Sequence, residues 1–409
     1  MFDVNYCRQQ FPAFQARPRA IFLDGPGGTQ VPQRVIDAIV HYLTHCNANH
    51  GGVFATSRES DAILHKAHVA VAELLNAPSD KEIVFGPNMT TLTLGFTRSI
   101  AKTLKPGDEI VVTKLDHDGN VSPWLLAARD AGATVRWIDI QTPDCTLDLD
   151  SLRRQLNDKT RWVAVGCASN AAGTINDVAG ITRLAHAAGA KVFLDAVHYA
   201  PHGPIDVQAW DCDALACSAY KFFGPHIGIL WARRQLLEEL PAYKLRPAAD
   251  TIPDRWMTGT QNHECIAGVA AAVEYLHDLG KHTGHTGDRR STLRAAMTAI
   301  QSYETELGRQ LLEGIAKLKR FEVWGIADVK KLAQRVPTVS ITLPGTTAEK
   351  MARQLAERDM YAWNGNMYAI NLSERLGLEN RGGFLRLGLL HYNTHEEVER
   401  LLAALAGLV

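Results

Sequence analysis

One lysine in the sequence is placed where an amine could react with a carbonyl group. Lys221 lies in the segment SAYKFFGPHIGIL, between an apolar strand-like run and a Gly-Pro turn, and Ser218 and Tyr220 flank it. A lysine held against apolar surface loses hydration, which favours the neutral amine that attacks a carbonyl to form a Schiff base. A surface lysine that closes a strand would have the same pattern, so Lys221 alone does not decide the chemistry.

An acid follows a second apolar run. Asp195 stands in VFLDAVHYAPHGPIDV, where a buried carboxylate is costly unless it meets a cation or strong donors. The protonated pyridine nitrogen of pyridoxal 5'-phosphate (PLP) is such a partner, and a helix N-cap is the competing interpretation. His198 and His202, four residues apart, could ligate a metal, but Pro201 between them argues against one helical face.

Further segments place polar groups directly after apolar runs. GPNMTTLTLGFTRSI opens a helix whose orphan N–H groups, with a hydroxyl from Thr90 or Thr91, would suit an anion. His117, in VVTKLDHDGNVSPW, could stack on a flat ring, and Asn170, in CASNAAGTIND, could donate to a phenolate oxygen. Helix caps and polar loops are the competing interpretations of these segments.

Strand-like runs alternate with amphipathic helical stretches through roughly the first 285 residues, which predicts βα units and a mainly parallel sheet. The ligands of such a sheet bind beyond the carboxyl ends of its strands, where the polar residues above would meet. The runs are EIVF (82–85), EIVVTKL (109–115), RWVAVGCAS (161–169), KVFLDAV (191–197), ALACSAY (214–220) and GILWA (228–232).

The order of elements changes near the segment KHTGHTGD. A long helical pattern near 289–319 precedes FEVWGIA, TVSITLP, AEKMARQLAERD, FLRLGLL and EEVERLLAAL, which reads as a smaller α+β unit. We therefore predict a large α/β domain over 16–285. The predicted small domain comprises 286–409 together with the N-terminal segment 1–15.

Composition narrows the possible functions. The 43 Lys and Arg residues against 44 Asp and Glu residues leave no positive excess for a phosphate backbone, so no nucleic-acid partner is expected. There is no apolar run of membrane-spanning length and no signal-peptide pattern at the start, which predicts a cytoplasmic protein without a membrane partner. The seven cysteines form no CxxC pair and indicate reduced thiols. The common nucleotide-loop, zinc-protease and serine-hydrolase motifs are absent.

With these residues in hand, the chain resembles the class V aminotransferase family of fold-type I PLP enzymes. It looks most like the cysteine desulfurase-like branch, which also holds selenocysteine lyases. The resemblance runs in order along nearly the whole chain. The motifs are FLDGPGGTQVPQRVIDAI, NANHGGV, GPNMTT, LDHDGNVSPW, SNAAGT, LDAVHYAPH, SAYKFFGP, GTQNHE and RLGLLHYNTHEEVERLL.

The resemblance implies a large domain with a mainly parallel seven-stranded sheet between helices, and a small α+β C-terminal domain. It implies that Lys221 holds PLP and moves the proton at the substrate α-carbon, that Asp195 pairs with the pyridine nitrogen, and that His117 stacks on the ring. Arg386 would clamp the substrate carboxylate. The implied cofactor-binding set is Met89, Thr90, Asn170, Asp195, His198, Ser218, Tyr220, Lys221 and Thr260, with Thr260 reaching the neighbouring subunit of a homodimer.

The implied activity is PLP chemistry at Cα or Cβ of a small amino acid, as a lyase (C–S cleavage or β-elimination) or an aminotransferase. Desulfurases carry a persulfide-forming cysteine in a loop shortly before the arginine, but the stretch 363–383 contains no cysteine. Residues 363–369 at its start, which include Trp363, Asn364, Asn366 and Tyr368, are expected to form part of the substrate wall. One alternative is a catalytically silent PLP-fold binding or regulatory protein, and a more remote one is a metal hydrolase that uses His198 and His202.

Overall fold

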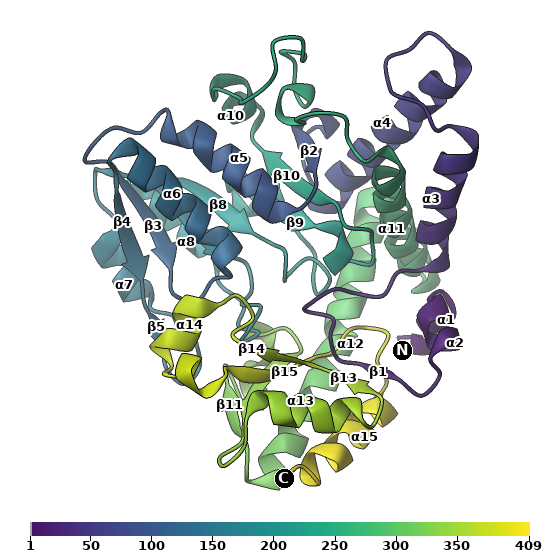
Figure 1. The fold of residues 1–409 in the computed structure, drawn as a ribbon, viewed down its shortest axis with the longest axis vertical. Helices are drawn as coiled ribbons and strands as arrows, with labels where there is room; N and C mark the ends of the chain where they lie inside the picture. The colour runs from purple at the N-terminus through teal and green to yellow at the C-terminus, as the bar shows by residue number, and fades with distance from the viewer. Residues whose placement is uncertain (1) are drawn as a thin grey trace.

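The computed structural model describes residues 2–409, and a seven-stranded sheet forms its centre (Figure 1). Strand β10 alone runs against the others, because it pairs antiparallel with both of its neighbours. The expectation of a mainly parallel seven-stranded sheet is therefore confirmed. Its order is β2 (Ile83–Gly86), β10 (Gly228–Ala232), β9 (Ala214–Ser218), β8 (Lys191–Asp195), β7 (Thr160–Gly166), β3 (Glu109–Thr113) and β4 (Thr134–Ile138).

Helices cover both faces of this sheet, and alternate strand residues point to the two sides. Val111 and Val163 pack into the core that contains residues of α4, α8 and α11, whereas Ile110 and Ala164 pack with α5, α6 and α10. The helices of the large unit are α3 (Gln33–His45), α4 (Ala55–Leu75), α5 (Met89–Ala101), α6 (Ser122–Ala131), α7 (Leu149–Gln155), α8 (Val178–Ala187), α9 (Val207–Trp210), α10 (Arg234–Glu239) and α11 (His263–His282).

A second, antiparallel sheet of four strands lies at the lower end of the molecule in Figure 1. It packs with its helices around a separate core that includes Val339, Leu385 and Leu401. Its strands, in order, are β11 (Glu322–Trp324), β12 (Thr338–Thr342), β15 (Phe384–Gly388) and β14 (Trp363–Gly365). The helices after the large unit are α12 (Arg289–Leu318), α13 (Ala348–Ala356), α14 (Ile370–Arg375) and α15 (His395–Ala406).

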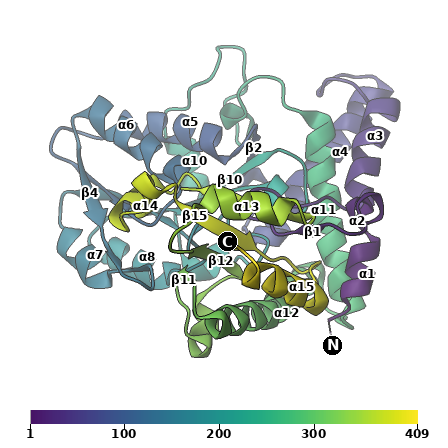
Figure 2. The same ribbon diagram turned by 60° about the horizontal axis from the view of Figure 1, so that its bottom comes forward.

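The N-terminal helices α1 (Val4–Gln9) and α2 (Pro12–Ala16) lie beside both units, as Figure 2 shows from a second side. The Arg8 guanidinium donates to Glu397 of α15 at 2.8 Å, while Phe11 belongs to the core of the large unit. The chain then forms β1 (Ile21–Phe22), which pairs with β13 (Met360–Tyr361), while β5 (Ile140–Gln141) pairs with β6 (Thr146–Leu147). The domain boundaries proposed from the sequence remain a prediction. In residues 2–409 no helix has the length and apolar character needed to cross a bilayer.

The carboxyl ends of the parallel strands hold the polar residues singled out in the sequence. Asp195 is the last residue of β8, and Lys221 ends a short 3-10 turn, η3 (Ala219–Lys221), that follows β9. His117 lies just beyond β3, and Asn170 follows β7. Because parallel strands end at one edge of the sheet, residues distant in sequence meet there, on the side that faces β14 and β15.

One glycine of β10 lets the start of α5 approach the sheet. A Cβ on Gly228 would overlap the backbone of Asn88, which caps α5, so Gly228→Ala must displace the helix N-terminus. We expect this substitution to lower the free energy of unfolding by about 2–4 kcal/mol. Gly95→Ala in the same helix meets open space and should change it by less than about 1 kcal/mol. Denaturant melts of both variants test this, and equal stabilities would contradict it.

Candidate active site

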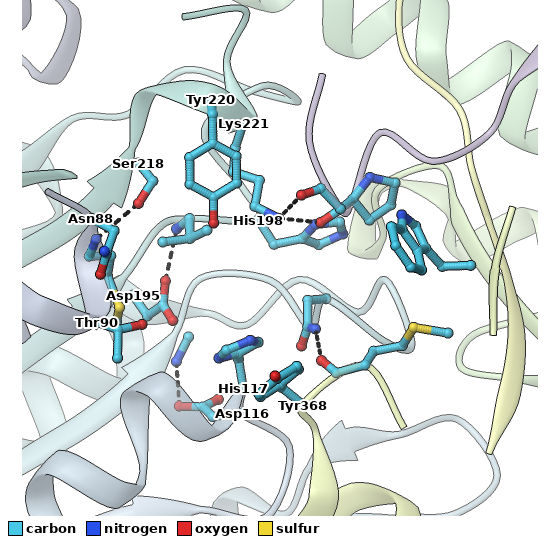
Figure 3. A pocket seen from close by; sticks show the side chains of 18 of the residues that line it. Asn88, Thr90, Asp116, His117, Asp195, His198, Ser218, Tyr220, Lys221 and Tyr368 are labelled. Carbon is cyan, nitrogen blue, oxygen red and sulfur yellow. Dashed lines mark hydrogen bonds between the residues drawn. The ribbon is translucent and has the colours of Figure 1, made fainter. Parts of the chain in front are cut away.

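A cavity of about 680 Å³ opens at the carboxyl edge of the large sheet, under the turn that follows β14 (Figure 3). The structure brings most of the site residues predicted from the sequence together at this cavity, but Thr260, Thr91 and His202 do not line it. Thr260 is exposed in the loop before α11 and lies outside the cavity of its own chain. The predicted residues that line the cavity are Met89, Thr90, His117, Asn170, Asp195, His198, Ser218, Tyr220, Lys221, Asn364, Asn366 and Arg386.

Lys221 directs its amine at backbone carbonyls and has no carboxylate ion-pair partner in the described chain. Its Nζ donates to the carbonyl oxygens of Pro26 and Gly27, the latter at 3.0 Å, and lies 4.9 Å from the centre of the Tyr220 ring. Loss of hydration and the nearby Arg386 charge lower the pKa of the lysine to about 7. A large neutral fraction at physiological pH makes this amine a competent nucleophile.

Asp195 supplies a buried carboxylate on the same side of the cavity. One of its oxygens accepts the backbone N–H of Val197 at 2.8 Å, and the other has no hydrogen-bond partner in the described chain. Burial raises the pKa of Asp195 to about 6, so the group is mainly ionised at pH 7 and is stabilised further by any cation that binds beside it. The free oxygen is therefore suited to a protonated ring nitrogen or another cationic donor.

A second buried acid, Asp116, lies beside Asp195 and was not predicted from the sequence. It accepts the Asn120 amide at 2.8 Å and the backbone N–H of Gly166 at 2.9 Å, which ties the turn around His117 to strand β7. Burial, followed by repulsion from Asp195, raises the pKa of Asp116 to about 7. The only sequence signal for it was its position directly before His117.

The His117 ring forms one wall of the cavity and is neutral. Its Nδ1 accepts the backbone N–H of Gly119 at 2.9 Å, and burial lowers its pKa to about 4. The Tyr368 ring stacks on it with centroids 5.5 Å apart and planes 13° from parallel. The Tyr368 carbonyl also accepts the Asp118 N–H at 2.7 Å, so the turn after β14 is fastened to the large unit at this point.

The N-terminus of α5 forms the polar end of the cavity. The Asn88 side chain caps the helix by accepting the N–H of Thr91 at 2.9 Å, and the N–H of Met89 donates to Ser218 Oγ at 3.0 Å. Thr90, Ser218 and Tyr220 present their hydroxyl groups around this helix end (Figure 3). A helix N-terminus surrounded by hydroxyl donors is suited to a phosphate group.

Asn170 and His198 lie on the side of the cavity nearest the small sheet. The Asn170 amide donates to the Met367 carbonyl at 2.7 Å, while its Oδ1 is buried without a partner. His198 Nε2 lies 3.1 Å from Thr338 Oγ1, and burial holds the pKa of His198 well below its usual range. His202 Nδ1 is engaged 2.6 Å from Glu304, and residues 2–409 contain no cluster of three metal-ligating side chains.

Arg386, on β15, is a buried cation that has no carboxylate of residues 2–409 at ion-pair distance, although the charge of the nearby Asp24 acts on it. Its exposed fraction is 5%, and no carboxylate of residues 2–409 forms an ion pair with it. Nη1 donates to the Asn170 carbonyl at 2.9 Å, whereas Nε is buried and has no partner. Burial lowers the pKa of Arg386 to about 9, which still leaves it charged at pH 7. A buried, unpaired guanidinium at a cavity wall is suited to an anionic ligand.

Sequence reasoning missed the contribution of the glycine-rich segment DGPGGTQ to this site. Its spacing fits no nucleotide loop, yet the Pro26 and Gly27 carbonyls hold the amine of Lys221. His226, which stacks on Tyr220, also lines the cavity and carried no sequence signal of its own, whereas Met367 lies within the predicted wall 363–369. Backbone acceptors of this kind leave no side-chain signature, so only their place in the fold identifies them.

Three comparisons place the chain among known proteins. The sequence profile of the class V aminotransferases matches residues 21–401. The aminotransferase-like protein FGM3 of Gibberella zeae is 34% identical over 99% of this chain and 98% of its own length. A probable cysteine desulfurase of Synechocystis is 30% identical over 98% of this chain and 94% of its own length. The crystal structure of the cysteine desulfurase CsdA from Escherichia coli superimposes with a TM-score of 0.84 at 29% identity, covering 99% and 98% of the two chains.

Proposed function

The chain belongs to the class V aminotransferase family of fold-type I enzymes, whose members use PLP, and from this premise we propose its reaction. We propose that it acts at Cα or Cβ of an amino acid, as a lyase (β-elimination, including C–S cleavage) or an aminotransferase, without forming a persulfide. One observation carries the proposal: a nucleophilic amine, a buried acid and a buried unpaired guanidinium converge on one cavity, from Lys221, Asp195 and Arg386.

The residues present fit the coenzyme. The α5 N-terminus with Thr90 and Ser218 suits a phosphate, and the free oxygen of Asp195 suits a protonated ring nitrogen. The buried Oδ1 of Asn170 is a hydrogen-bond acceptor without a partner in the chain, so it is available to a donor group of a bound molecule. When bound, the coenzyme withdraws electrons from the α-carbon of the attached amino acid. Lys221 Nζ, with its pKa near 7, can take up and return a proton at that carbon.

The remaining residues orient the substrate and exclude water. The Asp195 carboxylate is buried, so its negative charge stabilises a positive partner more strongly than it would in water. The neutral His117 ring supplies a flat apolar wall, and Arg386 fixes the substrate carboxylate through directed N–H donors. Such orientation selects which bond at the α-carbon is weakened.

The cysteines support the exclusion of persulfide chemistry. None of the seven lines the cavity, six are buried, and Cys265 is half-buried. Burial raises the pKa of each thiol, to about 12 for Cys7 and Cys145, whereas sulfur transfer requires an accessible thiolate. Seven unpaired thiols are also typical of a reducing compartment, so the cytoplasm is the proposed location.

We further propose that the enzyme is a homodimer in which Thr260 reaches the site of the other subunit. Thr260 is exposed and lies outside its own cavity, which leaves its hydroxyl accessible to a second chain. Sedimentation should give a dimer, and mixing Thr260→Ala with Lys221→Ala chains should give heterodimers with one intact site. A monomer with full activity would contradict this part of the proposal.

Product identity tests the proposed function. The PLP-loaded protein should show a near-visible absorption band that disappears on borohydride reduction. Pyruvate with ammonia would indicate elimination, and a keto acid with aminated coenzyme would indicate transamination. Alanine formed from cysteine, together with sulfide released when a thiol reductant is added, would contradict the exclusion of persulfide chemistry. A protein whose band responds to no amino acid would instead support the silent, regulatory alternative.

The lowered pKa of Lys221 predicts a pH profile in protein freed of coenzyme. Only the neutral amine reacts with formaldehyde, so reductive methylation of Lys221 should be constant above pH 8 and should fall about tenfold per pH unit well below pH 7. For an ordinary lysine, with a pKa of about 10.4, the rate of methylation should still rise between pH 8 and 10. Peptide mass spectrometry distinguishes the two, and a Lys221 profile parallel to that of the exposed lysines would contradict the prediction.

A further inference from the structure

The strand that carries Arg386 is paired with the strand that carries a tryptophan. In the antiparallel ladder of β14 and β15, Trp363 is the direct partner of Arg386. Directly opposed residues project to the same face of a sheet, with Cβ atoms about 4.5–5.5 Å apart. Whatever group Arg386 clamps therefore lies beside the indole of Trp363, and both side chains line the cavity.

The indole also lies against the loop that holds the reactive amine. A Cβ added to Gly27 would overlap the indole Nε1 of Trp363, and the carbonyl of the same glycine accepts Lys221 Nζ at 3.0 Å. Trp363 therefore lies beside both Arg386, which would hold the substrate carboxylate, and Gly27, whose carbonyl accepts the amine of Lys221. It nevertheless keeps 54% of its surface exposed, an area for which the chain provides no cover.

A second aromatic ring continues this wall. Tyr368 is 73% exposed and lines the cavity at the end of the turn after β14. Met367 and Tyr368 both adopt the left-handed backbone conformation, with φ of 58° and 57°, a cost that must be compensated by the contacts of the turn. Those contacts are the bond from Asp118 N–H, the bond from Asn170 and the stack on His117. The turn thus holds Tyr368 in place at the cavity mouth.

The wall formed by residues 363–368 carries no charge. Its polar groups are Asn364 and Asn366, and the Asn366 amide is already engaged with Glu379 at 3.0 Å. The acids of the cavity, Asp116 and Asp195, belong to the large unit at its sheet edge and not to this wall. A substrate carboxylate side chain that extends from the clamped α-carboxylate along the wall would meet the electron-rich faces of indole and phenol, with the Glu379 carboxylate behind Asn366, and no cation of the wall would pair with it.

We infer that the substrate of this site is an amino acid with an uncharged, apolar side chain that lies on the indole of Trp363. The inference rests on the proposed function, since it assumes that Arg386 binds the α-carboxylate. Burying apolar surface against an exposed indole is favourable, whereas an unpaired carboxylate in the same place loses hydration without compensation. The difference in affinity between an apolar amino acid and an acidic one of similar size should therefore be larger than the difference that side-chain size alone produces.

Titration of the PLP-loaded protein with amino acids, followed by its absorption band, tests the inference. The matched pairs are leucine against aspartate and methionine against glutamate, with alanine as the amino acid that hardly reaches the wall. We expect half-saturation by leucine or methionine at a concentration at least about tenfold lower than for the charged partner. A charged amino acid that saturates the site at the same or a lower concentration than its apolar match overturns the inference.

Two variants assign the preference to the tryptophan. Trp363→Ala should raise half-saturation by leucine about tenfold and leave that by alanine within about twofold, and Trp363→Phe should restore most of the difference. Equal losses for leucine and alanine, or no loss for either, would overturn the assignment of Trp363. Failure of the proposed function and failure of this inference give different results. A wild-type protein without a coenzyme absorption band refutes the proposed function. A normal band together with a preference for acidic amino acids refutes only this inference.

Discussion

Replacing Lys221 with alanine is expected to lower turnover of any amino-acid substrate by roughly 10⁴-fold or more. The variant loses the one amine of residues 2–409 that lines the cavity, whose pKa is near 7, and with it both the proposed attachment of the coenzyme and the proposed proton carrier. The phosphate-binding end of the cavity, at the α5 N-terminus, is unchanged. The variant should therefore still bind PLP, but borohydride should no longer fix the coenzyme to the chain.

Lys114→Ala is the matched control for that substitution. Lys114 also follows a strand of the large sheet, β3, but its Nζ pairs with Asp139 at 3.6 Å and it does not line the cavity. Its activity and its absorption band should match those of the wild type. Borohydride labelling of the Lys221→Ala chain, found by peptide mass spectrometry at another lysine, would show that the reactive amine has been misassigned.

Replacing Arg386 with glutamine is expected to raise the KM for amino acids about 100-fold, with a smaller effect on kcat. The guanidinium is buried and has no ion pair, so a bound carboxylate supplies its counter-charge, and the neutral amide would leave that carboxylate without one. Because an unpaired buried cation destabilises the free protein, the melting temperature of the variant should not fall by more than about 3 °C.

Two further variants make the Arg386 result specific. Arg386→Lys keeps the charge but loses the planar fork, so we expect a KM between those of the wild type and the glutamine variant. Arg375→Gln removes an exposed arginine on α14 that pairs with Asp139 at 2.9 Å, and it should leave KM unchanged. If Arg386→Gln binds amino acids as tightly as the wild type, the carboxylate is held elsewhere and the substrate assignment is wrong.

The strands that the sequence identified are the buried ones. The runs that contain β3, β7, β8, β9 and β10 are apolar along their length, because helices cover both faces of these strands. β4 and β14 were not assigned as strands. β4 is an edge strand in which exposed and half-buried residues alternate, and β14 has only three residues, of which Trp363 and Asn364 are exposed. Without burial there is no hydrophobic pattern to read.

The sequence by itself determined which polar residues meet at the cavity. Lys221, Asp195, His117 and Asn170 each follow an apolar run, and parallel strands must end at one edge, so their convergence follows from local pattern alone. The ordered motifs added Arg386, which no local pattern distinguishes from other strand arginines. Their identification required no knowledge of side-chain contacts.

Only the tertiary structure decided the pKa values of those residues and which side chains lie beside them in the cavity. The pKa of Lys221 depends on walls contributed by segments far apart in the chain, and its carbonyl partners come from residues nearly 200 positions earlier. Trp363 lies beside Arg386 because two strands pair in one register, and the 22 residues between them carry no periodic signal. Desolvation and strand register are properties of packed neighbours, so they exist only once the chain has folded.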